Sequence, residues 1–321
     1  MNSAPLAVIG AGAWGTALAI QAARAGGRVS LWARDPDRAA SIAATRVSPR
    51  LPGARLPEAV EVTASIRPAD LYLLAVPMQH LRAVAARLPE GAAVICAKGV
   101  EAGTLALPLE VLAELDPARP AAVLTGPNFA HEIAAGLPAA AVVAAADPAL
   151  RGRIAERLAT PTFRLYGNDD PVGAQLGGAA KNVIAIAAGT VAGAGLGENA
   201  RAALITRGLA EIARLVVALG GRAETVAGLS GLGDLLLTCT GPASRNYSLG
   251  LALGGGEPLA AILAGRDAVT EGVATAPALR ARARTVGLEL PICAAVADLL
   301  SGRMTLPEVM TALLSRPRRE E

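Results

Sequence analysis

Short apolar runs alternate with helix-length stretches along the first half of the chain. The apolar runs lie at 6–10, 28–34, 71–76, 92–98, 121–126 and 139–146, and a last strand is expected at 162–168. Stretches long enough for helices separate most of these runs, for example 14–26, 78–87 and 148–159. Buried strands that alternate with helices are typical of a parallel sheet covered on both faces. The pattern therefore predicts a doubly wound, mostly parallel α/β sheet.

From about residue 172 the pattern changes to helical spacing, and no convincing strand follows. Apolar residues recur with a period of about 3.6 between 204 and 219, which predicts an amphipathic helix closed by glycine. More helices are expected at about 258–264, 272–286, 291–301 and 306–315. The apolar stretch 182–197 is shorter than the roughly 20 residues that span a bilayer, so we expect a buried helix. We predict one domain at 1–170 and an all-helical domain at 171–321.

A glycine fingerprint follows the first expected strand directly and opens a helix. Gly10, Gly12 and Gly15 have the spacing GxGxxG. In dinucleotide-binding folds these glycines allow a tight turn, a close approach of the pyrophosphate to the backbone, and close packing of helix on strand. The N-terminus of the helix then faces the anion. We expect a dinucleotide site here, the alternative being a tight turn without a ligand.

The end of the second expected strand bears on the choice of cofactor. An acidic residue about 20 positions beyond the fingerprint normally holds the ribose hydroxyls of NAD, and Asp35 has that spacing. Asp35 before Pro36 also fits a helix N-cap followed by proline. Arg34 stands at the strand end, where a guanidinium suits a 2′-phosphate or stacks on adenine. We therefore favour NADPH over NADH.

Composition singles out two lysines. Of 30 Lys and Arg residues, lysine occurs only at 98 and 181. Lys98 and Gly126 end neighbouring apolar runs at the carboxyl edge of the expected sheet, where such folds bind ligands. Lys181 follows the small residues "QLGGAA", which allow a close approach. Lysine can release a proton near neutral pH when its pKa is lowered, and arginine does not. Both lysines therefore suit proton chemistry, with chance survival in a biased composition as the alternative.

Two polar clusters lie in the second half. Asp234 and Thr238 stand four residues apart on one helical face. An acid among leucines and glycines needs a partner, for which Lys181 is a candidate and a helix cap is the alternative. The segment "SRN" at 244–246 groups hydroxyl, guanidinium and amide donors suited to a small phosphate, or forms an ordinary turn and helix start.

Other features exclude several classes of protein. The net charge is +3, but the arginines are scattered and the basic tail 315–321 is short, so nucleic-acid binding is not expected. Cys96, Cys239 and Cys293 lie far apart, and the two histidines form no constellation, so neither disulfides nor a metal site are expected. The early first strand leaves no room for a signal peptide. We expect a cytoplasmic protein without stable membrane insertion. The tail residues 317–321 lie outside the part of the chain that the structure describes.

The ordered set of motifs resembles the bacterial NAD(P)-dependent glycerol-3-phosphate dehydrogenases. It comprises "GAGAWG", "AKG", "GPNFA", "AAKNVIAIAAG", "GLSGLGDLLLTC", "SRNYSLG" and "VTEGVATA". The resemblance implies reversible reduction of dihydroxyacetone phosphate to sn-glycerol 3-phosphate with NADPH or NADH, for glycerophospholipid synthesis. It also implies an N-terminal Rossmann domain joined to a C-terminal all-α domain of the 6-phosphogluconate-dehydrogenase type, and a homodimer as a family-level expectation.

The resemblance also implies roles for individual residues. Lys181 matches the general acid/base, Lys98 the second lysine near the substrate oxygen, and Asp234 the residue that orients Lys181 or a substrate hydroxyl. The implied substrate contacts are Lys98, Gly126, Asn128, Lys181, Asn182, Asp234, Thr238, Ser244, Arg245 and Asn246. The implied cofactor contacts are Gly10, Gly12, Ala13, Trp14, Gly15, Arg34, Lys98, Ala130, Arg245, Val269 and Glu271. The motif GPxFA often has Thr or Ser where this chain has Asn128, which leaves the contact of that residue open.

Two rival functions stay open. One is a related two-domain reductase of a β-hydroxy acid or a ketoacid such as ketopantoate, against which the phosphate-suited donors at 244–246 argue. The other is a non-catalytic dinucleotide sensor, which would need neither lysine. In each enzymatic case the partner is a small-molecule substrate.

Overall fold

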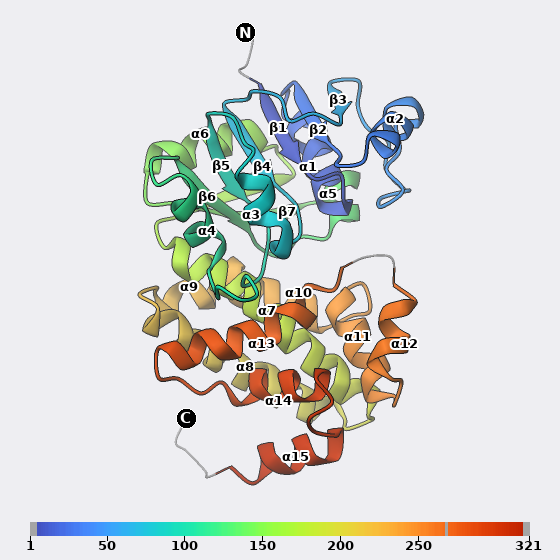
Figure 1. Ribbon diagram of the computed structural model, residues 1–321, viewed down its shortest axis with the longest axis vertical. Coiled ribbons are helices and arrows are strands. Elements are labelled where there is room, and N and C mark those ends of the chain that lie inside the picture. The colour runs from blue at the N-terminus through green and yellow to red at the C-terminus, as the bar shows by residue number, and fades with distance from the viewer. Residues whose placement is uncertain (1–4, 267–268, 317–321) are drawn as a thin grey trace. The chain divides into compact units, whose positions relative to one another are not determined.

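The computed structural model describes residues 5–266 and 269–316, and the chain forms two compact units (Figure 1). The first unit contains Met1–Lys98 and Ala106–Gln175, and the second contains Gly99–Leu105 and Leu176–Glu321. Nothing in the apolar pattern marks the short segment Gly99–Leu105 as part of the second unit. The chain leaves the first unit for this segment directly after Lys98.

The first unit is built on one eight-stranded sheet with the order β3-β2-β1-β4-β5-β6-β7-β8. Every neighbouring pair is parallel except β6 and β7, so the mostly parallel, doubly wound sheet is confirmed. The strands are β1 Leu6–Ile9, β2 Val29–Trp32, β3 Val60–Thr63, β4 Leu71–Leu74, β5 Ala92–Ile95, β6 Ala121–Thr125, β7 Ala139–Ala144 and β8 Phe163–Asn168. The sequence did not predict β3, because this four-residue edge strand exposes Glu61 and lacks a continuous apolar run.

Helices cover both faces of this sheet. Along β1, Leu6 and Val8 pack into one layer, while Ala7 and Ile9 pack into the other. The first layer is completed by α1 Ala13–Arg24, α2 Pro36–Thr45, α5 Ala130–Ala135 and α6 Pro148–Leu158. The second layer is completed by the 3₁₀ turn Met78–His80, α3 Leu81–Ala85 and α4 Pro108–Leu115. Side chains that alternate between two buried layers explain why the strands appear in the sequence as continuous apolar runs.

Among its described residues, the second unit contains helices and connecting segments but no β-strand. Its elements are α7 Pro171–Gly193, which begins in the first unit, α8 Glu198–Ala218, α9 Ala223–Ala227, a π-helical turn Leu229–Gly233, α10 Asp234–Cys239, α11 Arg245–Gly254, α12 Leu259–Ala264, α13 Glu271–Thr285, α14 Pro291–Leu300 and α15 Leu306–Leu314. By length and composition α7 could cross a membrane, but 89% of its most apolar window is buried inside the protein, as in a core helix. The expected end of this helix at 197 was wrong. Gly195 and Gly197 adopt left-handed φ angles of 67° and 88°, which do not continue an α-helix.

Four glycines bring the backbones of α7 and α11 into contact. Gly189 and Gly193 lie one turn apart on α7, and Gly250 and Gly254 lie one turn apart on α11. A Cβ on Gly189 would lie 2.1 Å from the Tyr247 carbonyl oxygen, and one on Gly250 would lie 2.0 Å from that of Ile186. Because only glycine lacks a Cβ, this helix pair requires glycine at these positions. The start of α11 is thereby fixed beside the middle of α7.

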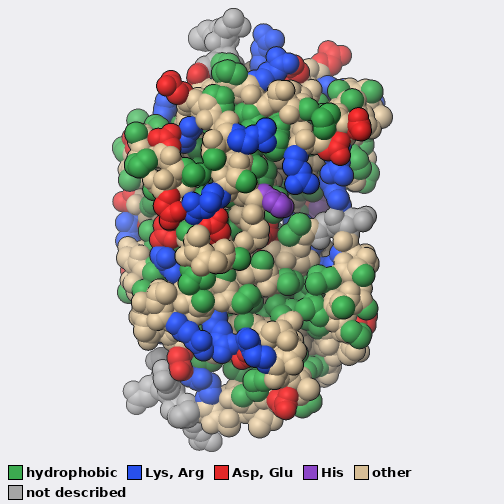
Figure 2. Space-filling model, viewed as in Figure 1, with side chains coloured by type: hydrophobic (Ala, Val, Ile, Leu, Met, Phe, Trp, Pro, Cys, Tyr) green, Lys and Arg blue, Asp and Glu red, His purple; other side chains and the backbone are tan. Residues whose placement is uncertain are grey.

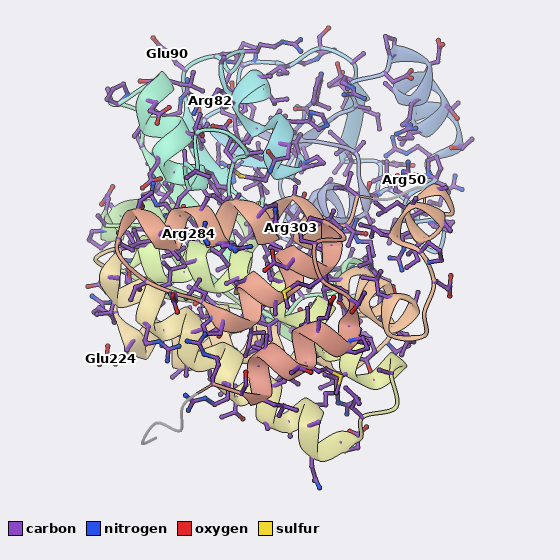
Figure 3. All side chains as sticks on the ribbon, turned by 60° about the horizontal axis from the view of Figure 1, so that its bottom comes forward. Arg50, Arg82, Glu90, Glu224, Arg284 and Arg303 are labelled. Atoms are coloured by element: carbon purple, nitrogen blue, oxygen red, sulfur yellow. The ribbon has the colours of Figure 1, made fainter. Side chains whose placement is uncertain are left out.

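Polar side chains tie the remaining helices together. Asp298 on α14 accepts hydrogen bonds of 2.7 Å from Arg280 on α13 and from Arg303, which is labelled in Figure 3. Desolvation acts to raise the pKa of Asp298, but the bonds from Arg303 and Arg280 outweigh it and hold the pKa below its usual value. Elsewhere, side chains of both signs intermingle over the face drawn in Figure 2.

A buried carboxylate closes the N-terminus of α14. Glu211 on α8 is 3% exposed and accepts hydrogen bonds from the backbone nitrogens of Ile292 at 2.8 Å and Cys293 at 3.3 Å. Glu211 thereby accepts from backbone N–H groups that the apolar side chain of the N-cap residue, Leu290, does not satisfy. Burial raises the pKa of Glu211, although these two hydrogen bonds act in the opposite direction.

Gly250→Ala is expected to lower the free energy of unfolding by roughly 1–3 kcal/mol, because its Cβ would overlap a backbone oxygen of α7. Chemical denaturation followed by circular dichroism measures the change. Gly152→Ala in α6 is the matched control, because a Cβ there would meet nothing within 4 Å. The control is expected to keep or gain stability, by roughly 0.5–1 kcal/mol. Equal stability of the two variants would contradict the backbone contact.

Replacement of Glu211 by glutamine is expected to change the pH dependence of stability. Because the folded pKa is raised above 4.5, the folded state binds more protons than the unfolded state between the two pKa values. The contribution of Glu211 to the unfolding free energy therefore falls as the pH rises through this window. Urea denaturation from acidic to neutral pH should show the wild type losing stability relative to Glu211→Gln. A difference that stays constant or grows in favour of the wild type would contradict the assignment.

Candidate active site

The glycine-rich loop between β1 and α1 has the geometry that a pyrophosphate requires. Gly10 has a φ of 117°, and a Cβ there would lie 2.8 Å from the Ala75 carbonyl oxygen. A Cβ on Gly15 would lie 1.8 Å from the carbonyl oxygen of Gly10, so α1 packs directly on the loop. At Gly12, the N-cap of α1, a Cβ would meet nothing within 4 Å. Open space at the N-terminus of a helix fits a bound phosphate group.

Neighbouring residues hold this loop in place. Ala13 and Trp14 begin α1 and pack, half-buried, against the core of the first unit. The fully buried hydroxyl of Ser48 donates a 3.3 Å hydrogen bond to the carbonyl oxygen of Ala11. Sequence reasoning missed Ser48, since a single serine in a loop of mixed composition carries no pattern that marks it.

At the end of β2 the two candidate cofactor residues differ in their surroundings. The carboxylate of Asp35 caps α2 and accepts from the backbone nitrogens of Asp37 at 2.9 Å and Arg38 at 3.1 Å. The N-cap interpretation of Asp35 is therefore confirmed. Arg34 is exposed directly before it. An exposed guanidinium beside an engaged carboxylate suits a 2′-phosphate better than a pair of ribose hydroxyls.

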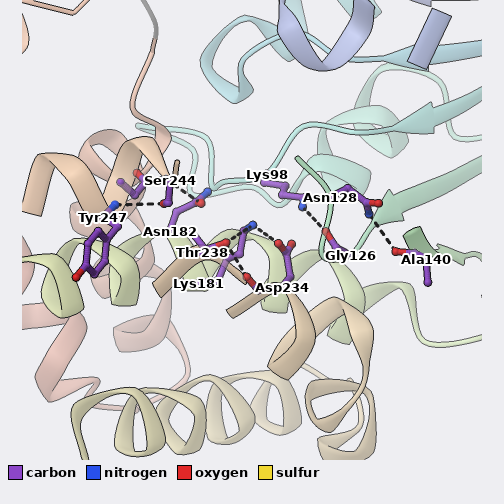
Figure 4. A network of polar contacts seen from close by, with 11 residues as sticks. Lys98, Gly126, Asn128, Ala140, Lys181, Asn182, Asp234, Thr238, Ser244 and Tyr247 are labelled. Atoms are coloured by element: carbon purple, nitrogen blue, oxygen red, sulfur yellow. Dashed lines mark hydrogen bonds and ion pairs between the residues drawn. The ribbon is translucent and has the colours of Figure 1, made fainter. Parts of the chain in front are cut away.

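The loops after β5 and β6 meet at one edge of the sheet. Lys98, three residues beyond β5, donates through Nζ to the carbonyl oxygen of Gly126 at 3.3 Å (Figure 4). Their predicted proximity is therefore confirmed. Asn128 donates through Nδ2 to the Ala140 carbonyl oxygen at 3.2 Å, so its side chain is tied to β7. Its Oδ1 is buried and has no hydrogen-bond partner among residues 5–266 and 269–316. Ala130 begins α5, two residues further on.

In the second unit, Lys181 forms a buried ion pair with Asp234 (Figure 4). The Lys181 ammonium also donates to Thr238 Oγ1 at 2.8 Å, and that hydroxyl donates to the Asp234 carbonyl oxygen at 2.6 Å. Lys181 is 7% exposed and Asp234 is 1% exposed. The predicted pairing of Asp234 with Lys181 is therefore confirmed. Asp234 and Thr238 also lie on one helical face, as predicted.

Glycine makes this pairing sterically possible. A Cβ on Gly177 would lie 2.7 Å from the Ser230 carbonyl oxygen in the π-helical turn that leads into Asp234. The small residues before Lys181 therefore let this turn approach α7. The thiol of Cys239 lies close by, and burial raises its pKa to about 12, although Lys181 acts in the opposite direction. Cys239 is therefore a neutral thiol at physiological pH and not a nucleophile.

The segment 244–246 starts α11 with three differently engaged side chains. Ser244 caps the helix and accepts from the Tyr247 backbone nitrogen at 3.2 Å, so the ordinary helix start is present (Figure 4). Arg245 is exposed and donates to the Val269 carbonyl oxygen at 2.7 Å. Asn246 is buried and donates to Asn182 Oδ1 at 3.0 Å.

The start of α13 contributes a contact that sequence reasoning missed. The backbone nitrogen of Gly272, next to Glu271 at the helix start, donates to Asn246 Oδ1 at 3.0 Å. A backbone N–H donor cannot be recognised from the residue type. The only sequence signal for this position was the family motif "VTEGVATA", which contains Gly272. Val269, two residues before Glu271, is 51% exposed. Within the described residues, no group of three or more His, Cys, Asp or Glu side chains could hold a metal ion.

Comparison with known proteins assigns the chain to a family. Two family models match it, described as the N-terminus and the C-terminus of NAD-dependent glycerol-3-phosphate dehydrogenase, over residues 5–151 and 170–311. The chain is 62% identical to glycerol-3-phosphate dehydrogenase [NAD(P)+] of Acidiphilium cryptum, over 98% of each chain. It is 55% identical to the enzyme of that name from Gluconobacter oxydans, over 97% of each.

A solved structure agrees with this assignment. The crystal structure of glycerol-3-phosphate dehydrogenase from Coxiella burnetii superposes with a TM-score of 0.93 at 37% identity, covering 98% of this chain and 99% of that one. The sequence comparisons and the structural comparison therefore point to the same family over both halves of the chain. The chain belongs to the NAD-dependent glycerol-3-phosphate dehydrogenase family.

Proposed function

We propose that the protein catalyses the NAD(P)H-dependent reduction of dihydroxyacetone phosphate to sn-glycerol 3-phosphate, and its reverse, for glycerophospholipid synthesis. The observation that carries the chemical part is the buried ammonium of Lys181, held by Asp234 and Thr238. We propose that residues 1–170 bind the cofactor and residues 171–321 bind the substrate. A spectrophotometric assay tests the reaction: NADPH should be oxidised only when dihydroxyacetone phosphate is present.

The first unit carries the proposed cofactor site. The open space at Gly12 and the N-terminus of α1 suit the pyrophosphate, and exposed Arg34 suits a 2′-phosphate, so we favour NADPH over NADH. When bound, NAD(P)H supplies the hydride that reduces the ketone carbon. The remaining proposed contacts of the cofactor are Gly10, Ala13, Trp14, Gly15, Lys98, Ala130, Arg245, Val269 and Glu271.

The two lysines have complementary proposed roles. Lys181 gives a proton to the developing alkoxide oxygen, and Asp234 and Thr238 hold its ammonium in place. Lys98 stabilises negative charge on the same oxygen. Arginine would not fulfil the first of these demands, because it does not release a proton near neutral pH.

A separate group of donors is proposed to anchor the phosphate. Arg245 supplies a guanidinium, and Ser244, Asn182 and Asn246 supply uncharged donors near the start of α11. Binding energy from this remote phosphate then positions the reacting carbon. Gly126 and Asn128 complete the proposed substrate contacts.

The rival functions differ in what they require. A ketoacid reductase would accept a substrate without phosphate, and a dinucleotide sensor would not turn over NADPH at all. Family membership favours the phosphorylated substrate, and the buried Lys181 argues against a sensor without catalysis. We propose in addition a cytoplasmic location, no stable insertion into a membrane, no nucleic-acid partner, and a homodimer.

Lys181→Arg is expected to lower kcat by on the order of 10²-fold or more, because the guanidinium keeps the positive charge but does not release a proton. Affinity for NADPH, measured by fluorescence titration, is expected to stay nearly unchanged. An alanine variant would instead leave Asp234 buried without its partner, at a cost of roughly 3–5 kcal/mol. Arg214→Lys, on the exposed side of α8, is the matched control and should keep its turnover. Near-normal turnover of Lys181→Arg would refute the assignment.

Arg34→Ala is expected to raise the KM for NADPH about tenfold or more while the KM for NADH stays the same. Loss of a hydrogen bond to a charged group costs roughly 1.5–3 kcal/mol, and only NADPH carries the 2′-phosphate. Steady-state kinetics with both cofactors measure the ratio. Arg38→Ala, at an exposed arginine in the first turn of α2, is the control for the loss of positive charge. Equal effects on both cofactors would contradict the role of Arg34.

A further inference from the structure

Arg24, in the last turn of α1, joins this helix to the C-terminal end of α5. Its Nη1 donates to the carbonyl oxygen of Ile133 at 2.9 Å, and its Nη2 donates to that of Ala134 at 2.6 Å. Both carbonyls belong to the last turn of α5, where backbone acceptors have no partner within the helix. A cation at this end also interacts favourably with the helix dipole. The guanidinium thus clamps the end of α5 to α1.

Gln21, one turn earlier on α1, holds this guanidinium in position. Gln21 is 1% exposed, and its Oε1 accepts a 2.6 Å hydrogen bond from Arg24 Nη1. Its Nε2 donates to the Leu158 carbonyl oxygen at 2.8 Å and to Thr160 Oγ1 at 3.1 Å, at the end of α6. The orientation of the amide is fixed, because the carbonyl of Leu158 can only accept and Arg24 can only donate.

The short helix α5 depends on contacts of this kind. It has six residues, and isolated helices shorter than ~12–15 residues are marginal in water. It ends at Gly136, which has a left-handed φ of 77°. A Cβ on Gly136 would lie 3.4 Å from Arg24 Cζ, so the guanidinium packs directly against the residue that ends the helix. Where α5 lies on the sheet therefore depends on Arg24.

The helices α1 and α5 lie side by side on one face of the sheet (Figure 1). They follow β1 and β6, which both run parallel to β4 and β5, so both helices start at the carboxyl edge of the sheet. Ala13 and Trp14 at the start of α1 and Ala130 at the start of α5 pack on the same core layer. A cofactor that contacts both starts must therefore match the spacing between them.

We propose that Arg24, oriented by Gln21, is a positioning residue that sets the spacing between the glycine-rich loop and the segment 126–130. This segment carries proposed contacts of the substrate and of the cofactor. The inference rests on the proposed function in taking NAD(P)H as the ligand that contacts both places.

The clamp acts through the length of α1. This helix has 12 residues and is about 18 Å long, so it connects the loop at its start rigidly to Arg24 at its end. Without the guanidinium, the loop still binds the pyrophosphate, but the segment 126–130 is free to shift. A displacement of about 1 Å in a reacting group can lower a rate by 10²-fold. Loss of the clamp therefore lowers turnover more than cofactor affinity.

Arg24→Met tests the clamp, because methionine keeps an unbranched apolar stem and removes the guanidinium. The probe is 2′-phospho-ADP-ribose, which is NADPH without its nicotinamide. Titration calorimetry with this probe measures its Kd and, from the stoichiometry, the fraction of chains with an intact pyrophosphate site. The variant is expected to keep the wild-type Kd, while kcat per intact site with saturating NADPH falls about tenfold or more. Arg24→Lys, whose ammonium lacks the planar fork, is expected to lie between the two.

Arg119→Met is the matched control. Arg119 also belongs to the first unit and donates to two backbone carbonyl oxygens, those of Pro89 and Gly91, at 2.9 and 2.8 Å. These contacts lie just before β5 and β6 begin, at the amino edge of the sheet. The control is expected to lose stability but to keep the wild-type kcat per intact site. A kcat per intact site that stays normal in Arg24→Met, or falls equally in Arg119→Met, would overturn the proposal.

A second measurement does not need turnover. The emission of bound NADPH reports the surroundings of its nicotinamide, and we expect Arg24→Met, but not Arg119→Met, to change it. Unchanged emission in Arg24→Met would also count against the clamp. Thermal unfolding checks that each variant folds, and Arg24→Lys takes the place of Arg24→Met, with the same deciding outcomes, if the methionine variant does not. A wild type that binds NADPH but does not reduce dihydroxyacetone phosphate would contradict the proposed function, and the emission would still test the clamp.

Discussion

The buried ion pair of Lys181 and Asp234 imposes a strict constraint on the second unit. Removing two charges from water costs several kcal/mol per ion, and their attraction offsets this only with good geometry and further hydrogen bonds. Thr238 supplies one such bond by accepting from the ammonium. Because a buried ion pair adds little to stability, its presence is better explained by the proposed chemistry, in which it would hold the proton donor at a site largely shielded from water.

That pair depends on how closely other elements approach α7. Gly177 admits the π-helical turn that carries Asp234, while Gly189 and Gly193 admit α11 with its phosphate-suited start. Gly208 of α8 faces Ile184, where a Cβ would lie 2.8 Å from the side chain. Missing side chains on α7, and on α8 where it faces α7, thus bring neighbouring segments close to the helix that carries Lys181 and Asn182. Packing against α7 therefore requires glycine at these positions.

The sequence allowed prediction of those features that rest on local patterns. Buried parallel strands are continuous apolar runs, and a lone acid among leucines needs a partner, so most of the sheet and the pairing of Lys181 with Asp234 followed. The edge strand β3 has an exposed glutamate and gave no such signal. Asn246 was interpretable only as a donor, because its partners Asn182 and Gly272 lie 64 and 26 residues away and one of them is a backbone nitrogen. A single sequence does not reveal partners that are distant along the chain, least of all when the partner is a backbone nitrogen.

The contrast between the two lysines and the arginines follows from how each cation is used in the fold. Arg119 donates from one nitrogen to the carbonyl oxygens of Pro89 and Gly91 at 2.9 and 2.8 Å, and Arg24 donates to two consecutive carbonyl oxygens in α5. A planar guanidinium with five donors suits such multiple contacts and needs no change of protonation. Lys98 and Lys181 instead present compact ammonium groups, one to the carbonyl oxygen of Gly126 and one to a carboxylate and a hydroxyl. Arg24 and Arg119 thus join segments of backbone, whereas Lys98 and Lys181 are the cations to which we assign the proposed charge and proton chemistry.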